Sequence, residues 1–260
     1  MSHLLSGKTY IIMGVANHRS IAWGIAESLH KHGAKLIFTY ATERLGQDVK
    51  KLVEKLEGGE NSLLVKCDVT DDEDIQKCFR EIQSHYPVIH GVAHCIAFAN
   101  RDELKGEYAD TSREGYLLAQ NISVFSLAAI CRAVKPFMTE GGSIVTLSYL
   151  GGERVVANYN VMGVAKAALN ASVKYLANDF GKYGIRVNAI SAGPIRTLSA
   201  KAIGDFNLVL KEIEEKAPLK RATTPEEVGD VTVFLMSDLA RGVTGELLHV
   251  DSGYHVVGLK

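Results

Sequence analysis

Short apolar runs alternate along the chain with longer segments in which apolar residues recur at helical spacing. The runs are rich in Val, Ile and Leu, and we expect strands at residues 8–15, 34–40, 62–69, 89–99, 141–148, 184–190 and 246–251. The amphipathic segments predict helices at residues 20–33, 43–57, 71–86, 113–137, 159–181 and 225–237. Apolar strands that alternate with helices indicate a parallel sheet covered on both faces. The pattern therefore predicts an α/β fold: a single Rossmann-type doubly wound domain, with a seven-stranded parallel sheet, spanning residues 1–260.

The composition excludes several classes of protein. The 260 residues include 47% hydrophobic ones and carry a formal net charge of −1, which argues against a nucleic-acid binder driven by bulk charge. No run of about 18 apolar residues predicts a membrane span, and the N-terminus lacks the apolar region of a signal peptide. No CxxC pair is present, so we expect buried reduced thiols in a cytoplasmic protein and no metal site. The cysteines are Cys67, Cys78, Cys95 and Cys131.

The turn after the first predicted strand, "GVANHRSIAWG", occupies the place where a dinucleotide fold usually has GxGxxG. That motif is absent: Gly14 ends the strand, and Ser20 and Ala22 stand where further glycines are expected. Small residues still allow the backbone to approach a pyrophosphate, and the helix that begins at Ser20–Ile21 offers free N–H donors. The turn is either an ordinary βα connection with an N-cap serine or a nucleotide-binding turn, and its position favours the nucleotide.

A Tyr and a Lys open the helix predicted after the fifth strand. Tyr159 and Lys166 are seven residues apart, which on a helix returns both side chains to one face about 10.5 Å apart along the axis. Tyr149 precedes Tyr159 by ten residues. The segment is either a catalytic constellation or a helix that happens to contain these residues.

Together these features resemble the short-chain dehydrogenase/reductase superfamily, which also has a segment like "NAISAGPIRT" after its sixth strand. Most members have a Tyr four residues before the Lys, where this chain has Met162, and a Ser upstream, where it has Tyr149. The longer phosphate turn, Tyr-x6-Lys, "IAFA" and "GPIRTLSAK" are instead similar to the bacterial enoyl-[acyl-carrier-protein] reductase family. That resemblance covers about residues 7–253.

The resemblance implies hydride transfer from NADH to the β-carbon of a trans-2-enoyl thioester, in the elongation cycle of bacterial type II fatty acid biosynthesis. Negative charge then develops on the thioester oxygen, where a fixed hydrogen-bond donor stabilises the transition state. Tyr159 is the implied donor, and Lys166 would bind the nicotinamide ribose and lower the pKa of Tyr159. Tyr149 would either share proton delivery or form a wall of the acyl pocket. Ser148 is the alternative replacement for the usual Ser, and Ala99 would contact substrate.

The resemblance also implies a set of cofactor-binding residues at the ends of the strands. They are Gly14, Ser20, Ile21, Ala41, Arg44, Leu45, Asp68, Val69, Ile96, Lys166, Ile195, Arg196, Thr197, Leu198 and Ser199. Taken alone, Asp68 is also typical of a helix cap or a turn. After the second strand, Ala41 and Thr42 are neutral and Arg44 is the only basic residue. Because a 2′-phosphate requires Arg or Lys there, NADH is favoured and NADPH is the alternative.

The partner implied by the resemblance is acyl carrier protein, which is acidic. Arg196, Lys201 and Lys211 would receive it, unless they are only solvated surface charges. A homotetramer is also implied, with residues 113–137 and 158–180 at its interfaces. Two rivals remain, a reductase of 3-oxoacyl thioesters and a catalytically silent nucleotide-binding regulator. Met162 argues against the first, and retention of both Tyr159 and Lys166 argues against the second.

Overall fold

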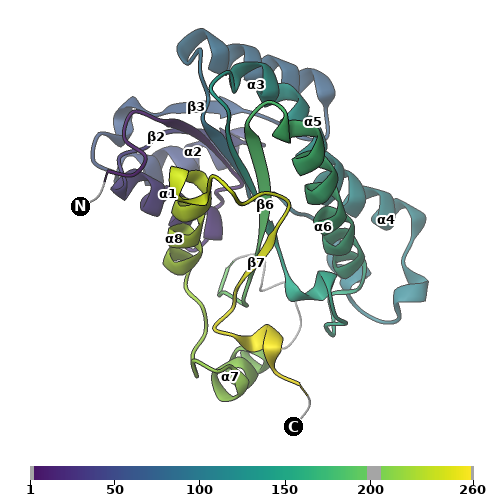
Figure 1. Ribbon diagram of the computed structural model, residues 1–260. Coiled ribbons are helices and arrows are strands. Elements are labelled where there is room, and N and C mark those ends of the chain that lie inside the picture. The colour runs from purple at the N-terminus through teal and green to yellow at the C-terminus, as the bar shows by residue number, and fades with distance from the viewer. Residues whose placement is uncertain (1–2, 198–205, 259–260) are drawn as a thin grey trace.

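The computed structural model, which describes residues 3–197 and 206–258, contains one parallel sheet (Figure 1). Its seven strands lie in the order β3-β2-β1-β4-β5-β6-β7, which confirms the predicted doubly wound α/β fold. Both halves of the sheet grow outward from β1 and β4, so the switch point of the topology lies between these two strands. The strands are β1 Thr9–Met13, β2 Lys35–Tyr40, β3 Leu63–Lys66, β4 Gly91–His94, β5 Gly142–Ser148, β6 Ile185–Ala192 and β7 Leu247–Val250.

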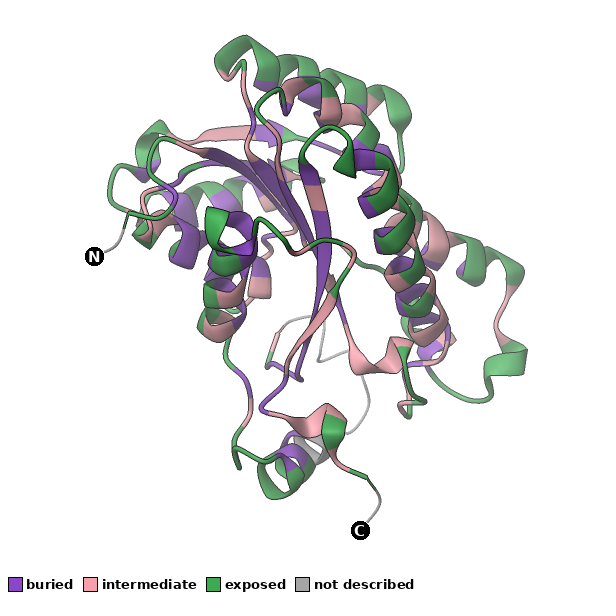
Figure 2. Ribbon diagram, in the orientation of Figure 1, coloured by how far each residue is buried: buried purple, intermediate pink, exposed green. Residues whose placement is uncertain are grey.

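Helices cover both faces of the sheet, and each face buries its own apolar core (Figure 2). One core joins the strands to α3, α5 and α6, and the other joins them to α1, α2 and α8. In Figure 1, α7 lies apart from these two layers, beyond one end of the sheet. The helices are α1 Ile21–Lys31, α2 Glu43–Val53, α3 Asp72–His85, α4 Arg113–Gln120, α5 Ser126–Val134, α6 Asn160–Gly181, α7 Phe206–Lys216 and α8 Pro225–Met236.

Several predicted bounds are corrected by the structure. The fourth strand was expected to reach residue 99, but β4 ends at His94 because the chain then leaves the sheet to line a cavity. The helix expected over residues 113–137 is interrupted by a π-helical segment, Asn121–Phe125, between α4 and α5. Helix α7 was not predicted at all. Tyr159, expected to open a helix, is instead the N-cap residue immediately before α6.

The segment Arg113–Phe137 is long and apolar enough to cross a membrane by length and composition alone, with a mean hydropathy of 1.6. Of its most apolar window, 44% is buried inside the protein. Its buried residues, such as Leu127, Ile130 and Val134, pack into the core shared with α3 and α6. Within the fold, the α5 part of this segment therefore packs as a core helix.

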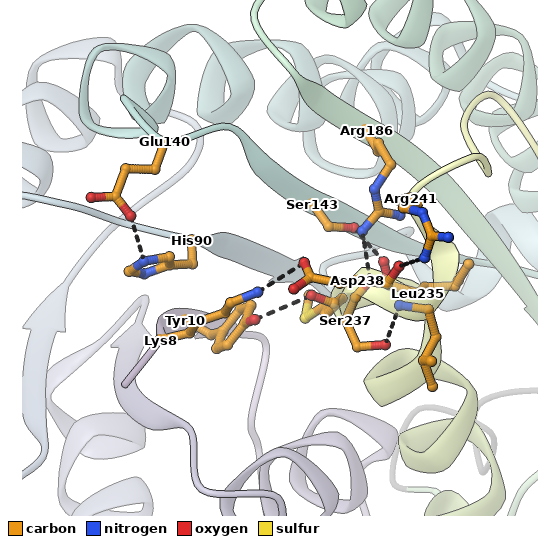
Figure 3. Close-up of polar contacts among 12 residues, drawn as sticks. Lys8, Tyr10, His90, Glu140, Ser143, Arg186, Leu235, Ser237, Asp238 and Arg241 are labelled. Carbon is orange, nitrogen blue, oxygen red and sulfur yellow. Dashed lines mark hydrogen bonds and ion pairs between the residues drawn. The ribbon is translucent and has the colours of Figure 1, made fainter. Parts of the chain in front are cut away.

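Polar side chains at the amino-terminal edge of the sheet bind the last carbonyl groups of α8 (Figure 3). The hydroxyl of Tyr10 donates to Met236 O at 3.2 Å, Ser143 Oγ donates to Leu235 O at 2.8 Å, and Arg186 Nη2 donates to Ser237 O at 3.2 Å. The final carbonyl groups of a helix have no hydrogen-bond partner within the helix. A cation near them also interacts favourably with the negative end of the helix dipole. These contacts fix α8 at the edge opposite to the cavity.

Helices α1 and α8 approach each other closely through small residues. A Cβ atom on Gly229 would lie 2.6 Å from Gly24 O and 2.4 Å from Ser28 Oγ. Real Cβ contacts of this length do not occur, so any side chain at Gly229 forces the two helices apart. The pairing therefore depends on glycine at this position.

We expect Gly229→Ala to lower the free energy of unfolding by about 1–3 kcal/mol, because overpacking a close helix contact strains the backbone. The matched control is Gly181→Ala, at an exposed helical glycine whose added Cβ would meet nothing within 4 Å. Thermal and urea unfolding measure both variants. If Gly229→Ala is as stable as Gly181→Ala, the contact between α1 and α8 does not require glycine at position 229.

Candidate active site

A cavity of about 710 Å³ lies beyond the carboxyl ends of β1, β4, β5 and β6, at the switch point of the sheet. It brings together ten of the residues that the sequence singled out. They are Gly14, Ser20, Ile21, Ile96, Ala99, Tyr149, Tyr159, Lys166, Ile195 and Thr197. Ligands of doubly wound folds bind at this place, because loops from neighbouring strands diverge there and leave a crevice.

The turn after β1 is shaped for close approach of a ligand to the backbone. Gly14 has φ +90°, and a Cβ atom there would lie 2.1 Å from Cys95 O on the loop after β4. Ser20 is the N-cap residue of α1, but its hydroxyl donates to Asn17 O at 2.6 Å and caps no helical N–H group. The first turn of α1 therefore keeps N–H donors directed at the cavity, which suits a pyrophosphate.

Tyr149 and Tyr159 contact each other edge to face, with ring centroids 4.9 Å apart. Tyr159 is 9% exposed, and the backbone beside it is unusual, since Asn158 and Asn160 have φ of 58° and 21°. A Cβ atom on Gly151 would lie 2.4 Å from the Tyr159 ring, so glycine is required where the loop crosses it. The two hydroxyl-bearing rings are thus held by the loop after β5 and the start of α6.

Burial sets the protonation of both tyrosines. It raises the pKa of Tyr149 to about 12, and it raises the pKa of Tyr159 well above its ordinary value, with Tyr149 adding to the effect. Burial and Tyr149 set the direction of this shift in the ligand-free protein, and the expected lowering by Lys166 stays a prediction for the cofactor-bound protein. Both hydroxyls remain protonated near neutral pH and can donate hydrogen bonds.

Lys166 is 5% exposed, and its Nζ donates to Leu147 O at 2.7 Å. Burial lowers its pKa to about 8, because a charged amine loses hydration inside the protein. The amine thus lies in the cavity with a backbone carbonyl as its hydrogen-bond partner, and it has further N–H groups to offer a ligand.

A buried polar chain that the sequence analysis missed connects the helices and strands beneath the cavity. His94 Nδ1 lies 3.1 Å from Thr146 Oγ1, and His94 Nε2 lies 2.9 Å from Ser126 Oγ. Ser126 donates to Ile122 O at 2.6 Å, so it accepts from His94 Nε2–H, which leaves Nδ1 as an acceptor. The single proton of the Thr146 hydroxyl is shared between two acceptors on His94, Nδ1 and the backbone O, each 3.1 Å away. Burial lowers the pKa of His94 to about 3, which keeps it neutral. Polar residues inside apolar strands were the only sequence signal for this chain.

Ser148 Oγ is buried at the end of β5 and has no hydrogen-bond partner among the described residues. Such groups are rare in folded proteins and need an explanation. Because Ser148 lines the cavity, a bound ligand or water can supply the partner. The alternative that Ser148 replaces the usual superfamily Ser therefore stays open.

Other predicted cofactor residues lie outside the cavity. Ala41, Arg44 and Leu45 follow β2, and Asp68 and Val69 follow β3, at the same carboxyl edge of the sheet. Asp68 has the turn role that its residue type suggested, since Oδ1 accepts from the N–H group and hydroxyl of Thr70 at 2.9 and 2.7 Å.

The loop after β6 is only partly described. Arg196 is exposed and lines a neighbouring hollow with His18 and Arg19. Leu198, Ser199 and Lys201 lie outside the described residues. In the described ranges, Cys67, Cys78 and Cys131 are buried free thiols and Cys95 is half-buried, and no cluster of three or more His, Cys, Asp or Glu residues is arranged to hold a metal ion.

Comparisons with known proteins identify relatives over nearly the whole chain. The profile of the family described as enoyl-(acyl carrier protein) reductase matches residues 14–255. The chain is 71% identical, over 98% of its length and 99% of the relative's, to enoyl-[acyl-carrier-protein] reductase [NADH] FabI of Bacillus cereus. It is 56% identical, over 97% of its length and 98% of the relative's, to enoyl-[acyl-carrier-protein] reductase [NADPH] FabI of Staphylococcus aureus.

A solved structure gives the same result. The crystal structure of the Bacillus cereus enoyl-acyl carrier protein reductase with NADP+ and indole naphthyridinone matches with a TM-score of 0.98 at 71% identity, covering 100% of both chains.

We expect Lys166→Met to raise the melting temperature of the ligand-free protein at pH 7. With a folded pKa of about 8 against 10.5 for an ordinary Lys, the unfolded chain binds more protons between these pH values. The charged amine therefore costs on the order of 3 kcal/mol below about pH 8, and stability recovers as pH rises toward 10.5. The advantage of the variant over the wild type should accordingly shrink by pH 10.

Lys174→Met, at an exposed Lys on the same helix, is the control and should leave the melting temperature nearly unchanged. A Lys166→Met variant that melts below the wild type at pH 7 would show that burying the charged amine does not destabilise the ligand-free protein.

Proposed function

The chain belongs to the enoyl-[acyl-carrier-protein] reductase family, and we propose that it reduces trans-2-enoyl thioesters carried by acyl carrier protein, with NADH as reductant. This reaction is one of the two reductive steps of the elongation cycle in bacterial type II fatty acid biosynthesis. The observation that carries the proposal is the cavity itself, in which Tyr159, Tyr149 and Lys166 converge beside the turn after β1. The cytoplasm is the expected location.

Three features of the cavity suit a dinucleotide. Gly14 lets the turn after β1 lie against Cys95 O at the edge of the cavity, α1 offers uncapped N–H donors, and the buried amine of Lys166 faces the same cavity. The bound cofactor supplies the hydride. Gly14, Ser20 and Ile21 would hold its pyrophosphate, and Ile195 and Thr197 would close over the nicotinamide. Lys166 would exchange its bond to Leu147 O for the ribose hydroxyls.

Tyr159 would act on the substrate. When hydride adds to the β-carbon, negative charge develops on the thioester oxygen, and a preorganised donor lowers the barrier most. The raised pKa of Tyr159 keeps its hydroxyl protonated, so it can donate to that oxygen throughout the step. Tyr149 packs edge to face on Tyr159 and would fix the ring while bordering the acyl chain with Ala99.

NADH is the proposed reductant because the segment after β2 offers a 2′-phosphate only one basic residue. Ala41 and Thr42 are exposed and neutral, and Thr42 caps α2 by accepting from Leu45 N at 3.4 Å. Arg44, two residues after Thr42, is exposed. The relatives named above include both an NADH and an NADPH enzyme. We attribute the preference of this chain to the segment after β2.

Acyl carrier protein and further copies of the chain are the proposed partners. The exposed basic residues near the cavity, Arg196 and Lys211, would face the acidic carrier, although Lys211 already lies 3.9 Å from Glu215. A homotetramer is proposed because large apolar side chains are exposed on the π-helical segment and on α4 and α6. They include Leu117, Phe125 and Tyr175.

The purified protein should consume NADH in the presence of a crotonyl or longer trans-2-enoyl thioester, with a higher kcat/KM than with NADPH. Absorbance of the reduced nicotinamide reports the reaction directly. Turnover of 3-oxoacyl thioesters alone would instead identify a ketoreductase, and a preference for NADPH would assign the 2′-phosphate to Arg44 or to the backbone.

Tyr159→Phe keeps the ring and removes the donor, so we expect kcat to fall about 10²–10³-fold with little change in the Kd for NADH. Tyr149→Phe should be milder, with an effect on KM that grows with acyl length. Steady-state kinetics and cofactor titration on the two matched variants separate these roles. If Tyr149→Phe abolished turnover while Tyr159→Phe left it intact, the two assignments would be reversed.

A further inference from the structure

The π-helical segment between α4 and α5 carries a serine whose hydroxyl binds the loop after β4. Ser123 is fully buried, and its Oγ lies 3.0 Å from Phe98 N and 3.1 Å from Phe98 O. A hydroxyl has one proton to donate and lone pairs that accept. Ser123 therefore accepts from the N–H group of Phe98 and donates to its carbonyl, so one side chain holds both backbone groups of one loop residue.

Phe98 lies in the middle of a wall of the cavity. Strand β4 ends at His94, and residues 95–101 then line the cavity without belonging to a strand. Backbone N–H and C=O groups that leave a sheet need new hydrogen-bond partners. Without such partners, nothing holds the loop in one conformation. Ser123 supplies both partners at Phe98, next to the proposed substrate contact Ala99.

The π-helical segment directs this contact, which is consistent with the frequent occurrence of such segments at functional sites. Ser126, three residues further along, binds His94 in the strand rather than the loop. Ser123 Oγ also lies 3.7 Å from the sulfur of Met162, the residue that replaces the usual superfamily Tyr. Since the single proton of Ser123 goes to the stronger acceptor, Phe98 O, the sulfur contributes packing. Met162 thus supports the hydroxyl that fixes the wall.

We propose that Ser123 is a positioning residue for the acyl chain: through the backbone of Phe98 it fixes the cavity wall formed by residues 95–101. The proposal rests on the proposed reduction of enoyl thioesters. A twelve-carbon acyl chain presents far more apolar surface to this wall than a four-carbon chain does, so a loosened wall weakens binding of the long chain most. The chemistry at Tyr159 and the proposed pyrophosphate contacts lie on other elements. Ile96 is a proposed cofactor contact within the wall, but it lies two residues before Phe98 and next to the end of β4, so the cofactor should be largely spared.

The test compares Ser123→Ala with the wild type on crotonyl and dodecenoyl thioesters of coenzyme A. We expect the KM for the dodecenoyl substrate to rise about 5–30-fold, because two hydrogen bonds of a buried backbone segment are lost. The KM for the crotonyl substrate, kcat and the Kd for NADH should each change less than about threefold. Hydrogen exchange at the Phe98 amide should accelerate at least about tenfold in the variant.

Ser126→Ala is the matched control, because its hydroxyl lies on the same helical stretch but does not contact the loop. It should lower the melting temperature without changing the ratio of the two KM values. Should Ser123→Ala fail to fold, Ser123→Cys retains the shape with a weaker donor and acceptor and is read by the same assays.

Equal changes of KM for both substrates, or unchanged exchange at Phe98, would overturn the proposal. A wild type that reduces neither enoyl substrate would refute the proposed function instead, and the exchange measurement would still show whether Ser123 fixes the loop.

Discussion

The candidate site depends on how the buried amine of Lys166 is hydrogen-bonded inside the protein. Helix α6 carries it under the ends of the strands, where its described hydrogen-bond partner is the carbonyl of Leu147. A charge in such a place is unfavourable for folding, which explains its lowered pKa. The proposed role accounts for its retention, because the hydroxyl groups of a bound ribose would complete its hydrogen bonds. The same reasoning applies to the hydroxyl of Ser148, which has no partner among the described residues, so binding would satisfy groups that folding leaves incomplete.

The rest of the fold holds this unfavourable arrangement in place. The His94 chain ties β4, β5 and the start of α5 together beneath the cavity, and polar residues at the opposite edge of the sheet anchor α8. Close contacts at Gly14 and Gly151 leave the turns around the cavity little freedom. The tyrosines and Lys166 therefore reach the cavity from rigid elements, as catalytic geometry requires.

Much of this could be predicted from sequence, because strand alternation and the Tyr159–Lys166 spacing are local patterns. The features that sequence missed are tertiary. β4 ends at His94, and Ser123, distant in the chain, binds the loop that follows. The π-helical segment that carries Ser123 leaves no mark on periodicity. Likewise, the hydrogen bond from the amine of Lys166 to Leu147 O is a tertiary contact that the spacing of Tyr159 and Lys166 does not predict. Tyr159 stands at the N-cap of α6 between Asn158 and Asn160, both of which have positive φ.

A structure of the protein with NADH and an unreactive enoyl thioester analogue tests the roles proposed for Lys166 and Tyr159. We expect Lys166 Nζ to leave Leu147 O for the nicotinamide ribose, and Tyr159 Oη to lie about 2.6–3.2 Å from the thioester oxygen. Lys166 still bound to Leu147 O, with the thioester oxygen on Tyr149 instead, would contradict these roles.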